Sequence, residues 1–150
     1  MAAEFAAVRA AAARHRRKHD IALGVRAQVI VRESEEEAWA AAEALVSNAT
    51  EALRDAARDI WAESQANSRM KVLARSEGMR IGHRLWTGIA TVRQGAGVSI
   101  VGNPEQVAAT LEEYIALGAT EFCLSGYPHH TEATRFGELV MPFFRDRLAR

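Results

Sequence analysis

The sequence predicts an α/β fold in which a parallel sheet alternates with helices along the chain. Stretches rich in β-branched and apolar residues alternate with stretches of helical composition, as expected for successive strand–helix units. Residues that cap helices stand at the start of several helical stretches. Alanine contributes 30 of the 150 residues, which favours helix. The length suits one domain, and we treat residues 1–150 as a single domain.

The first half of the chain predicts a helix, a strand and a long helical region. Residues 4–18 are helical in composition, and residues 21–31 (IALGVRAQVIV) form a buried strand. Ser34 is a helix N-cap with Glu37 three positions later, which is a capping box. A helix follows this box, and residues 48–75 stay helical but carry more charge.

A glycine-rich stretch precedes the next strand–helix unit. Residues 76–99 contain five glycines and predict mostly loop. A short strand follows at residues 98–101. Asn103 then caps a helix that begins with proline and runs to Leu117, and Gly118 stands where glycine commonly ends a helix.

The last unit is a strand, a loop and a helix. Residues 120–125 (TEFCLS) predict the strand, and residues 126–130 (GYPHH) form the loop at its carboxyl end. Thr131 caps the last helix, which runs through Val140 and is stopped by Pro142.

Composition and charge order exclude several classes of protein. The formal net charge is zero, which provides no footprint for nucleic acid or an anionic membrane. The apolar stretches are too short to cross a bilayer. The basic residues 14–18 follow the alanine-rich residues 2–13, the reverse of a secretory signal, and a solvated helix end explains them better than a nucleic-acid patch. We therefore expect a cytoplasmic protein with no nucleic-acid or membrane partner.

The cysteine and the tryptophans predict packing rather than chemistry. Cys123 is the single cysteine, which excludes an internal disulfide and a cysteine-rich zinc site, and its mid-strand position predicts a packed thiol. Trp39 and Trp61 occupy helical positions and are expected to be packing residues. The role of Trp86, which lies in the glycine-rich stretch, is more open. No spacing of Asp, Glu or His completes a ligand set, so no metal is expected.

The loop after the last strand is one candidate site, because parallel α/β folds place function at the carboxyl ends of strands. Tyr127 and His129 in this loop can both donate hydrogen bonds, and His129 can exchange a proton near neutral pH. Gly126 allows close backbone approach to a ligand. The alternative is a rigid turn that carries surface histidines.

Two arginines are candidates for binding an anion. Arg93 stands beside Gly95 and Gly97 in VRQGAG, and a guanidinium at a glycine-rich turn suits a phosphate; a solvated loop arginine is the alternative. Arg26 and Gln28 share one face of their strand. A charged side chain on a buried strand needs a partner or a ligand, whereas on an edge strand it simply faces water.

Two segments carry a resemblance to a known family. Residues 85–144 contain LW-x-G, VR-x-GAG, VG-x-P-E-x-VA and the run SGYPH followed by E-A-x-R-F-G-E-L. Together with residues 25–45 (VRAQVIVRESEEEAWAAAEAL), they resemble the C-terminal part of the flavin-dependent alkanesulfonate monooxygenases, which belong to the bacterial luciferase-like superfamily. The resemblance covers nearly all of the chain from residue 21 onward.

The resemblance implies a fold, a cofactor and partners. The fold is a partial (β/α)8 TIM barrel, comprising about the last three strand–helix units, with residues 48–99 as a helical insertion and a mobile glycine-rich loop. The cofactor is reduced FMN (FMNH2), supplied by a separate NAD(P)H-dependent flavin reductase. The reduced flavin reacts with O2, and the C–S bond of a sulfonate or sulfone is cleaved.

The resemblance also implies roles for individual residues. Arg26 matches an arginine at the active site, and Arg93 matches an arginine of a mobile loop that closes over flavin and substrate. Tyr127 and His129 match a tyrosine and a histidine of the active-site loop. Gln28 departs from the family, which often has a histidine there. We expect catalytic roles for Tyr127, His129 and Arg26, and cofactor-binding roles for Arg93, Gly95, Gly97 and Gln28.

The chain is shorter than a complete barrel, which needs about 250 residues. Three strands in an open sheet leave two unpaired edges. We therefore expect either an oligomer that covers these edges or a complementing N-terminal half as partner. The alternative to an enzyme is a non-catalytic remnant or interaction module of the same fold that needs such a partner half.

Overall fold

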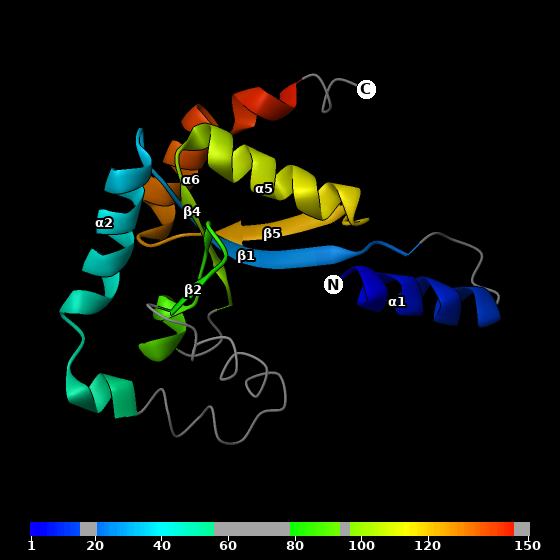
Figure 1. The fold of residues 1–150 in the computed structure, drawn as a ribbon, viewed down its shortest axis with the longest axis horizontal. Coiled ribbons are helices and arrows are strands. Elements are labelled where there is room, and N and C mark those ends of the chain that lie inside the picture. Colours follow the sequence, from blue (N-terminus) through cyan, green and yellow to red (C-terminus); the bar gives the residue numbers. More distant parts are fainter. Residues whose placement is uncertain (16–20, 56–78, 94–96, 146–150) are drawn as a thin grey trace.

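The computed structural model describes residues 1–15, 21–55, 79–93 and 97–145 (Figure 1). Five strands form one sheet in the order β2-β3-β4-β1-β5. The strands are β1 (Gly24–Val31), β2 (Arg80–Ile81), β3 (Leu85–Trp86), β4 (Ser99–Gly102) and β5 (Glu121–Ser125). The helices are α1 (Ala2–Arg14), α2 (Glu35–Ser47), α5 (Pro104–Ala116) and α6 (His129–Leu139), with short 3-10 turns η2 (Gly88–Thr91) and η3 (Met141–Phe144).

The sheet is mainly parallel and confirms the predicted fold class. β1 pairs in parallel with both β4 and β5, and helices connect these strands, which is consistent with part of a (β/α)8 barrel. β1 lies between β4 and β5, so the connection from β4 to β5 passes over β1. In a closed barrel, strands that follow one another in the chain pair with one another. Here β4 and β5 follow one another but do not pair, because β1 lies between them.

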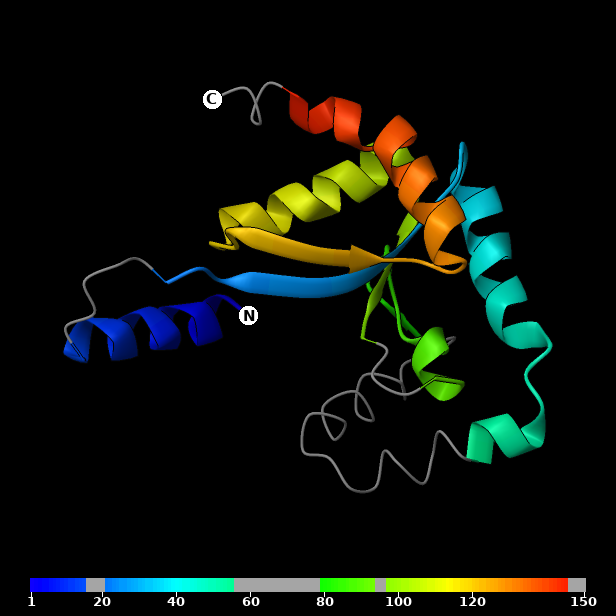
Figure 2. The ribbon, with the colours of Figure 1, turned by 180° about the vertical axis from the view of Figure 1, so that it is seen from behind.

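Alternating residues of β1 face two separate hydrophobic cores. Ala27, Val29 and Val31 pack with α5 and α6 on what we call the α5/α6 face. Ile30 packs with α2 and β3 on what we call the α2 face, which Arg26 and Gln28 share by alternation. Figure 2 shows α5 and α6 on one side of β1 and β5, with η2 on the other side.

The capping predictions for α2 and α5 are confirmed. The Ser34 hydroxyl accepts from the Glu37 amide at 3.2 Å, and the Glu37 carboxylate accepts from the Ser34 amide at 3.2 Å. Asn103 and Gln106 make the same reciprocal pair at 2.9 and 3.0 Å. Gly118 follows α5 with φ of 106°, a conformation that glycine adopts without steric cost. Each capping side chain stabilises its helix by about 1 kcal/mol.

The glycine-rich stretch is more ordered than predicted. Residues 79–93 contain β2, β3 and η2, so the prediction of mostly loop is wrong there. β3 pairs antiparallel with β4 and β2 pairs with β3, which extends one edge of the sheet. Trp86, whose role the sequence left open, is only 3% exposed, and a Cβ at Gly88 would collide with its indole ring. Gly88 therefore serves the packing of Trp86 rather than a loose loop.

The C-terminal elements differ from the prediction at two points. α6 begins at His129 after Pro128, two residues before the predicted cap Thr131, so both histidines of the loop are helical. α6 ends at Leu139, one residue before the predicted end at Val140. Pro142 lies in the 3-10 turn η3 that follows. Proline is favoured in the first turn of a helix because the missing amide hydrogen is not needed there.

Cys123 is exposed, which contradicts the prediction of a packed thiol. β5 is the edge strand of the sheet, and Cys123 lies beside Arg26 of β1 on the α2 face. Trp39, by contrast, is buried on α2 as predicted.

Several predicted bounds fall partly outside the described residues. α1 ends at Arg14, and residues 16–18 of the predicted helix 4–18 lie outside the described residues. Residues 51–55 are helical, whereas the rest of the predicted helical region through residue 75, with Trp61, lies outside the described residues. β1 begins at Gly24 rather than at residue 21.

Candidate functional site

Three of the predicted site residues lie together at the carboxyl edge of the sheet. The guanidinium carbon of Arg93 lies 4.3 Å from the centroid of the Tyr127 ring. The rings of Tyr127 and His129 are 4.8 Å apart between centroids and tilted by 47°. Arg93 follows η2, Tyr127 follows β5, and His129 begins α6. Segments far apart in the sequence therefore supply a cation, a phenol and an imidazole to one place, which we call the Arg93 cluster.

Local packing holds the Arg93 cluster in position. Tyr127 is half-buried and packs against the core of the α2 face, so its ring is fixed beneath Arg93. Gly126 lies so close to α6 that an added Cβ would collide with the Glu132 side chain and approach the Val29 carbonyl oxygen to 3.0 Å. The loop after β5 can approach α6 and β1 this closely only because residue 126 lacks a side chain.

A buried carboxylate next to the loop was missed by sequence reasoning. Glu132 on α6 is only 4% exposed; its Oε2 accepts from Nη1 of Arg32 at 3.1 Å, and its Oε1 forms an ion pair with Nη2 of Arg32 at 3.0 Å. Arg135 donates to the same carboxylate. Two guanidinium groups compensate the cost of burying this charge. The spacing Glu-x-x-Arg on a predicted helix was the available signal, but only the tertiary fold brings Arg32 to it.

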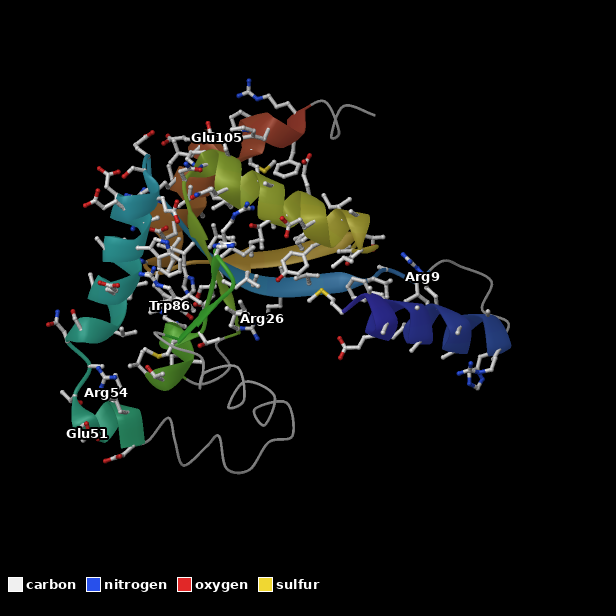
Figure 3. The ribbon with its side chains drawn as sticks, in the orientation of Figure 1. Arg9, Arg26, Glu51, Arg54, Trp86 and Glu105 are labelled. Carbon is white, nitrogen blue, oxygen red and sulfur yellow. The ribbon has the colours of Figure 1, made fainter. Side chains whose placement is uncertain are left out.

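Arg26 lies apart from the Arg93 cluster. Its side chain is exposed on β1, and Figure 3 shows it projecting away from α5. Arg26 is level with Cys123 of β5, and Tyr127 lies four residues further on, which is about 13 Å along a strand. The catalytic role of Arg26 stays a prediction.

Gln28 is buried and already engaged. Its side chain is 4% exposed, and its amide oxygen accepts from the Ser99 hydroxyl of β4 at 3.3 Å. Ser125 of β5 is level with Gln28 on the other side, so three polar residues form a row across the α2 face. The cofactor-binding role of Gln28 stays a prediction, and a ligand for its oxygen would have to replace or share the Ser99 contact.

The glycine-rich turn is only partly described. Gly95 lies outside the described residues. At Gly97 an added Cβ would make an ordinary contact, 3.7 Å from the Arg26 carbonyl oxygen, so Gly97 lies beside β1. The cofactor-binding roles of both glycines stay predictions.

The two candidate arginines fit an anionic group. Both are exposed, and neither forms an ion pair with a carboxylate among the described residues. Arg32, Arg80, Arg84 and Arg135, by contrast, all have carboxylate partners. A phosphate or sulfonate would therefore meet guanidinium groups whose charge is not already compensated there.

A second polar contact stabilises the same edge of the sheet. Glu35 at the start of α2 accepts from the Gln106 side chain at 2.6 Å and from the Trp39 indole at 3.4 Å. The hydrogen bond from Gln106, followed by that from Trp39, lowers the pKa of Glu35 below its usual value. Because Gln106 also caps α5, the amino ends of α2 and α5 are tied together.

The described ranges contain neither a metal-ligand cluster nor a membrane-spanning helix. No three residues of the types His, Cys, Asp or Glu gather there to hold a common metal ion. No helix in this part of the chain has both the length and the apolar character needed to cross a membrane.

The sequence matches the model of a known protein family. The model of the luciferase-like monooxygenases matches residues 1–121, which is most of the chain. The match includes Arg26, Gln28 and Arg93 and ends at the first residue of β5, so Tyr127 and His129 follow it. The alternation of helices with a mainly parallel sheet agrees with this match. The chain belongs to the luciferase-like monooxygenase family.

Proposed function

We propose that this protein takes part in an FMNH2-dependent monooxygenase reaction that cleaves the C–S bond of an alkanesulfonate or a related sulfone. Membership of the luciferase-like family provides the reaction class, a monooxygenase. The observation that carries the proposed flavin and organosulfur chemistry is the Arg93 cluster. In it, the Arg93 guanidinium, which has no carboxylate partner among the described residues, lies over the ring of Tyr127, and that ring contacts His129. A sulfonate and an FMN phosphate are both anions that guanidinium groups bind well.

The residues of the site have distinct tasks in this proposal. Arg93 binds an anionic group, and the Tyr127 ring holds the guanidinium in place. His129 is exposed at the start of α6, where its imidazole can donate a hydrogen bond or a proton to a bound group. Arg26 binds a second anionic group further along the α2 face. The reduced flavin, when bound, supplies the electrons that activate O2.

The proposed setting follows from the cofactor. A cytoplasmic NAD(P)H-dependent flavin reductase supplies the reduced FMN, and O2 and the organosulfur substrate complete the reaction. An oligomer or a complementing N-terminal half supplies further parts of the site.

An anaerobic titration with reduced FMN tests the proposal directly. Trp86 is buried on the α2 face, so binding nearby is expected to quench its fluorescence. We expect saturable binding in the micromolar range, weaker binding for Arg93→Ala, and partial recovery for Arg93→Lys. Sulfite release from an alkanesulfonate, with a flavin reductase added, then tests the reaction. Folded protein that does not bind reduced FMN at all would contradict a flavin site in this chain.

A second candidate is a non-catalytic interaction module of the same family. It is favoured by the position of β1 between β4 and β5 and by the Gln28 amide, whose oxygen already accepts from Ser99. This candidate predicts a folded protein that associates with a partner but neither binds reduced FMN nor releases sulfite with that partner present. The titration and the sulfite assay together separate the two candidates.

A further inference from the structure

The first turn of α6 carries a buried carboxylate that has no task in the proposed reaction. This residue, Glu132, lies three positions after His129 and is almost fully buried. Burying a carboxylate is costly unless both of its oxygens are paired. Apolar residues of similar volume often stabilise a buried position at least as well as an ion pair does, so burial alone does not explain this carboxylate.

The Glu132 side chain lies against the loop of residues 126–128, which carries Tyr127. A Cβ added to Gly126 would collide with the Cβ and Cγ atoms of Glu132. The backbone amide of Glu132 donates to the Pro128 carbonyl at 3.0 Å. Glu132 therefore contacts the loop on both sides of Tyr127, and a shift of Glu132 would displace the loop.

Arg32 fixes the Glu132 carboxylate to the sheet. Arg32 directly follows β1, and its backbone amide donates to the Gly102 carbonyl of β4 at 3.4 Å. Its Nη1 donates to the Val31 carbonyl at 2.6 Å and to Oε2 of Glu132 at 3.1 Å, and its Nη2 lies 3.0 Å from Oε1. Two parallel contacts to two oxygens set the orientation of the carboxylate as well as its distance. Glu132 is thus held to the carboxyl end of the central strand.

This tie lies beyond the point where β5 pairs with β1. The parallel pairing of the two strands ends at Gln28 and Ser125. Residues 126–128 then leave the ladder, and Arg32 lies four residues beyond Gln28 on the other segment. The ion pair between Arg32 and Glu132 therefore holds the loop where backbone pairing between β1 and β5 no longer does.

We propose that the Arg32–Glu132 ion pair positions Tyr127 for the binding of an anion at the Arg93 cluster. The centroid of the Tyr127 ring lies 4.3 Å from the guanidinium carbon of Arg93 and 4.8 Å from the centroid of the His129 ring. A displacement of the loop changes both distances at once. Arg32 and Glu132 are positioning residues, because they act through the loop. This role rests on the proposed function of the Arg93 cluster, whereas the geometry can be measured without a ligand.

Arg135 provides a matched control, because its guanidinium donates to the same carboxylate. It is half-buried like Arg32, but it lies on α6 itself, so it ties the helix to itself and not to the sheet. Arg32→Gln and Arg135→Gln each remove one guanidinium from Glu132, and both should lower the stability. Only Arg32→Gln should disturb the Arg93 cluster. Arg32→Lys, which keeps the charge but not the paired contacts, should recover part of the effect.

Nuclear magnetic resonance of the histidine rings measures the position of the loop in the protein without ligand. Aromatic rings as close as those of Tyr127 and His129 shift each other's proton resonances, and the Tyr127→Leu variant provides the His129 resonances without this effect. We expect Arg32→Gln to move the His129 resonances toward those of Tyr127→Leu. Arg135→Gln should keep the wild-type values. Resonances that stay unchanged in Arg32→Gln, or that move equally in both variants, would overturn the proposal.

Anaerobic titration with reduced FMN measures the consequence for binding. Loss of the cation–π support of Arg93 should raise the dissociation constant about two- to five-fold in Arg32→Gln. Arg135→Gln should leave it unchanged, and equal weakening in both variants would assign the effect to lost stability and overturn the positioning role. If the wild type does not bind reduced FMN, the proposed function fails, and the histidine spectra still decide whether Arg32 positions the loop.

Discussion

The Tyr127 ring supports the Arg93 guanidinium from below, at 4.3 Å between the guanidinium carbon and the ring centroid. The arginine comes from the glycine-rich stretch and the tyrosine from the loop after the edge strand. A cation is attracted to the face of an aromatic ring, and this attraction limits the orientations that the long arginine side chain adopts. Tyr127 therefore positions the group that we propose to bind the anion.

Replacement of Tyr127 should separate the role of the ring from that of the hydroxyl. Tyr127→Phe keeps the aromatic face, so the dissociation constant for reduced FMN should stay within about twofold. Tyr127→Leu removes the cation–π contact, which is worth about 0.5–1 kcal/mol at an exposed site, and should weaken binding about two- to five-fold. Tryptophan quenching under anaerobic conditions provides both constants. Equal loss in both variants would instead assign the role to the phenolic hydroxyl.

The buried Glu132 carboxylate should be a major determinant of stability. Glu132→Ala leaves the half-buried Arg32 and Arg135 without their partner and should lower the free energy of unfolding by about 2–4 kcal/mol. Urea unfolding followed by circular dichroism measures this loss. In the Arg32→Ala/Glu132→Ala double variant, the loss should be smaller than the sum of the single losses, because the two residues interact. Additive losses would show that the ion pair contributes little.

Two glycine-to-alanine variants should have opposite effects on stability. Gly88→Ala forces a Cβ into the Trp86 indole and should cost about 1–3 kcal/mol. Gly137 lies in α6 with no atom within 4 Å of an added Cβ, so Gly137→Ala should stabilise the protein by about 0.5–1 kcal/mol. Thermal unfolding measures both effects, and tryptophan fluorescence should shift only in Gly88→Ala. Stabilisation by both variants would show that Trp86 repacks freely.

Acid should remove the contribution of Glu35. Its pKa in the folded protein is lowered by the hydrogen bonds from Gln106 and Trp39. A carboxylate with a lowered folded pKa stabilises the fold above its unfolded pKa and loses this contribution as the pH falls through the folded pKa. The difference in unfolding free energy between wild type and Glu35→Gln should therefore be largest near pH 7 and shrink below about pH 4.3, the ordinary glutamate value. A difference independent of pH would exclude ionisation as the cause.

Local signals predicted the helices that begin with capping boxes, because Ser34 with Glu37 and Asn103 with Gln106 satisfy backbone groups within four residues. They failed where the partner is distant in sequence. The two-residue strands β2 and β3 exist only by pairing with each other and with β4, and the exposure of Cys123 depends on which strand lies at the edge.

The candidate site shows the same division. Tyr127 and His129 could be selected because the loop follows a clear strand, and Arg93 because it flanks glycines. No local pattern could predict that Arg93 lies beside Tyr127. The same holds for the pairing of Arg32 with Glu132, which are 100 residues apart in the sequence. The hydrogen bond that the buried Gln28 oxygen accepts comes from Ser99, which belongs to another strand.

The central position of β1 sets the timing of folding. Gln28 of β1 contacts Ser99, which is 71 residues further along the sequence. Leu23, just before β1, contacts Thr120, which is 97 residues further along. During synthesis, β1 must therefore wait for most of the chain to leave the ribosome before either of its neighbouring strands can pair with it. Such long-range pairing folds slowly and leaves apolar strand edges open in the meantime. The nascent chain is thus expected to depend on chaperone protection until β5 has emerged.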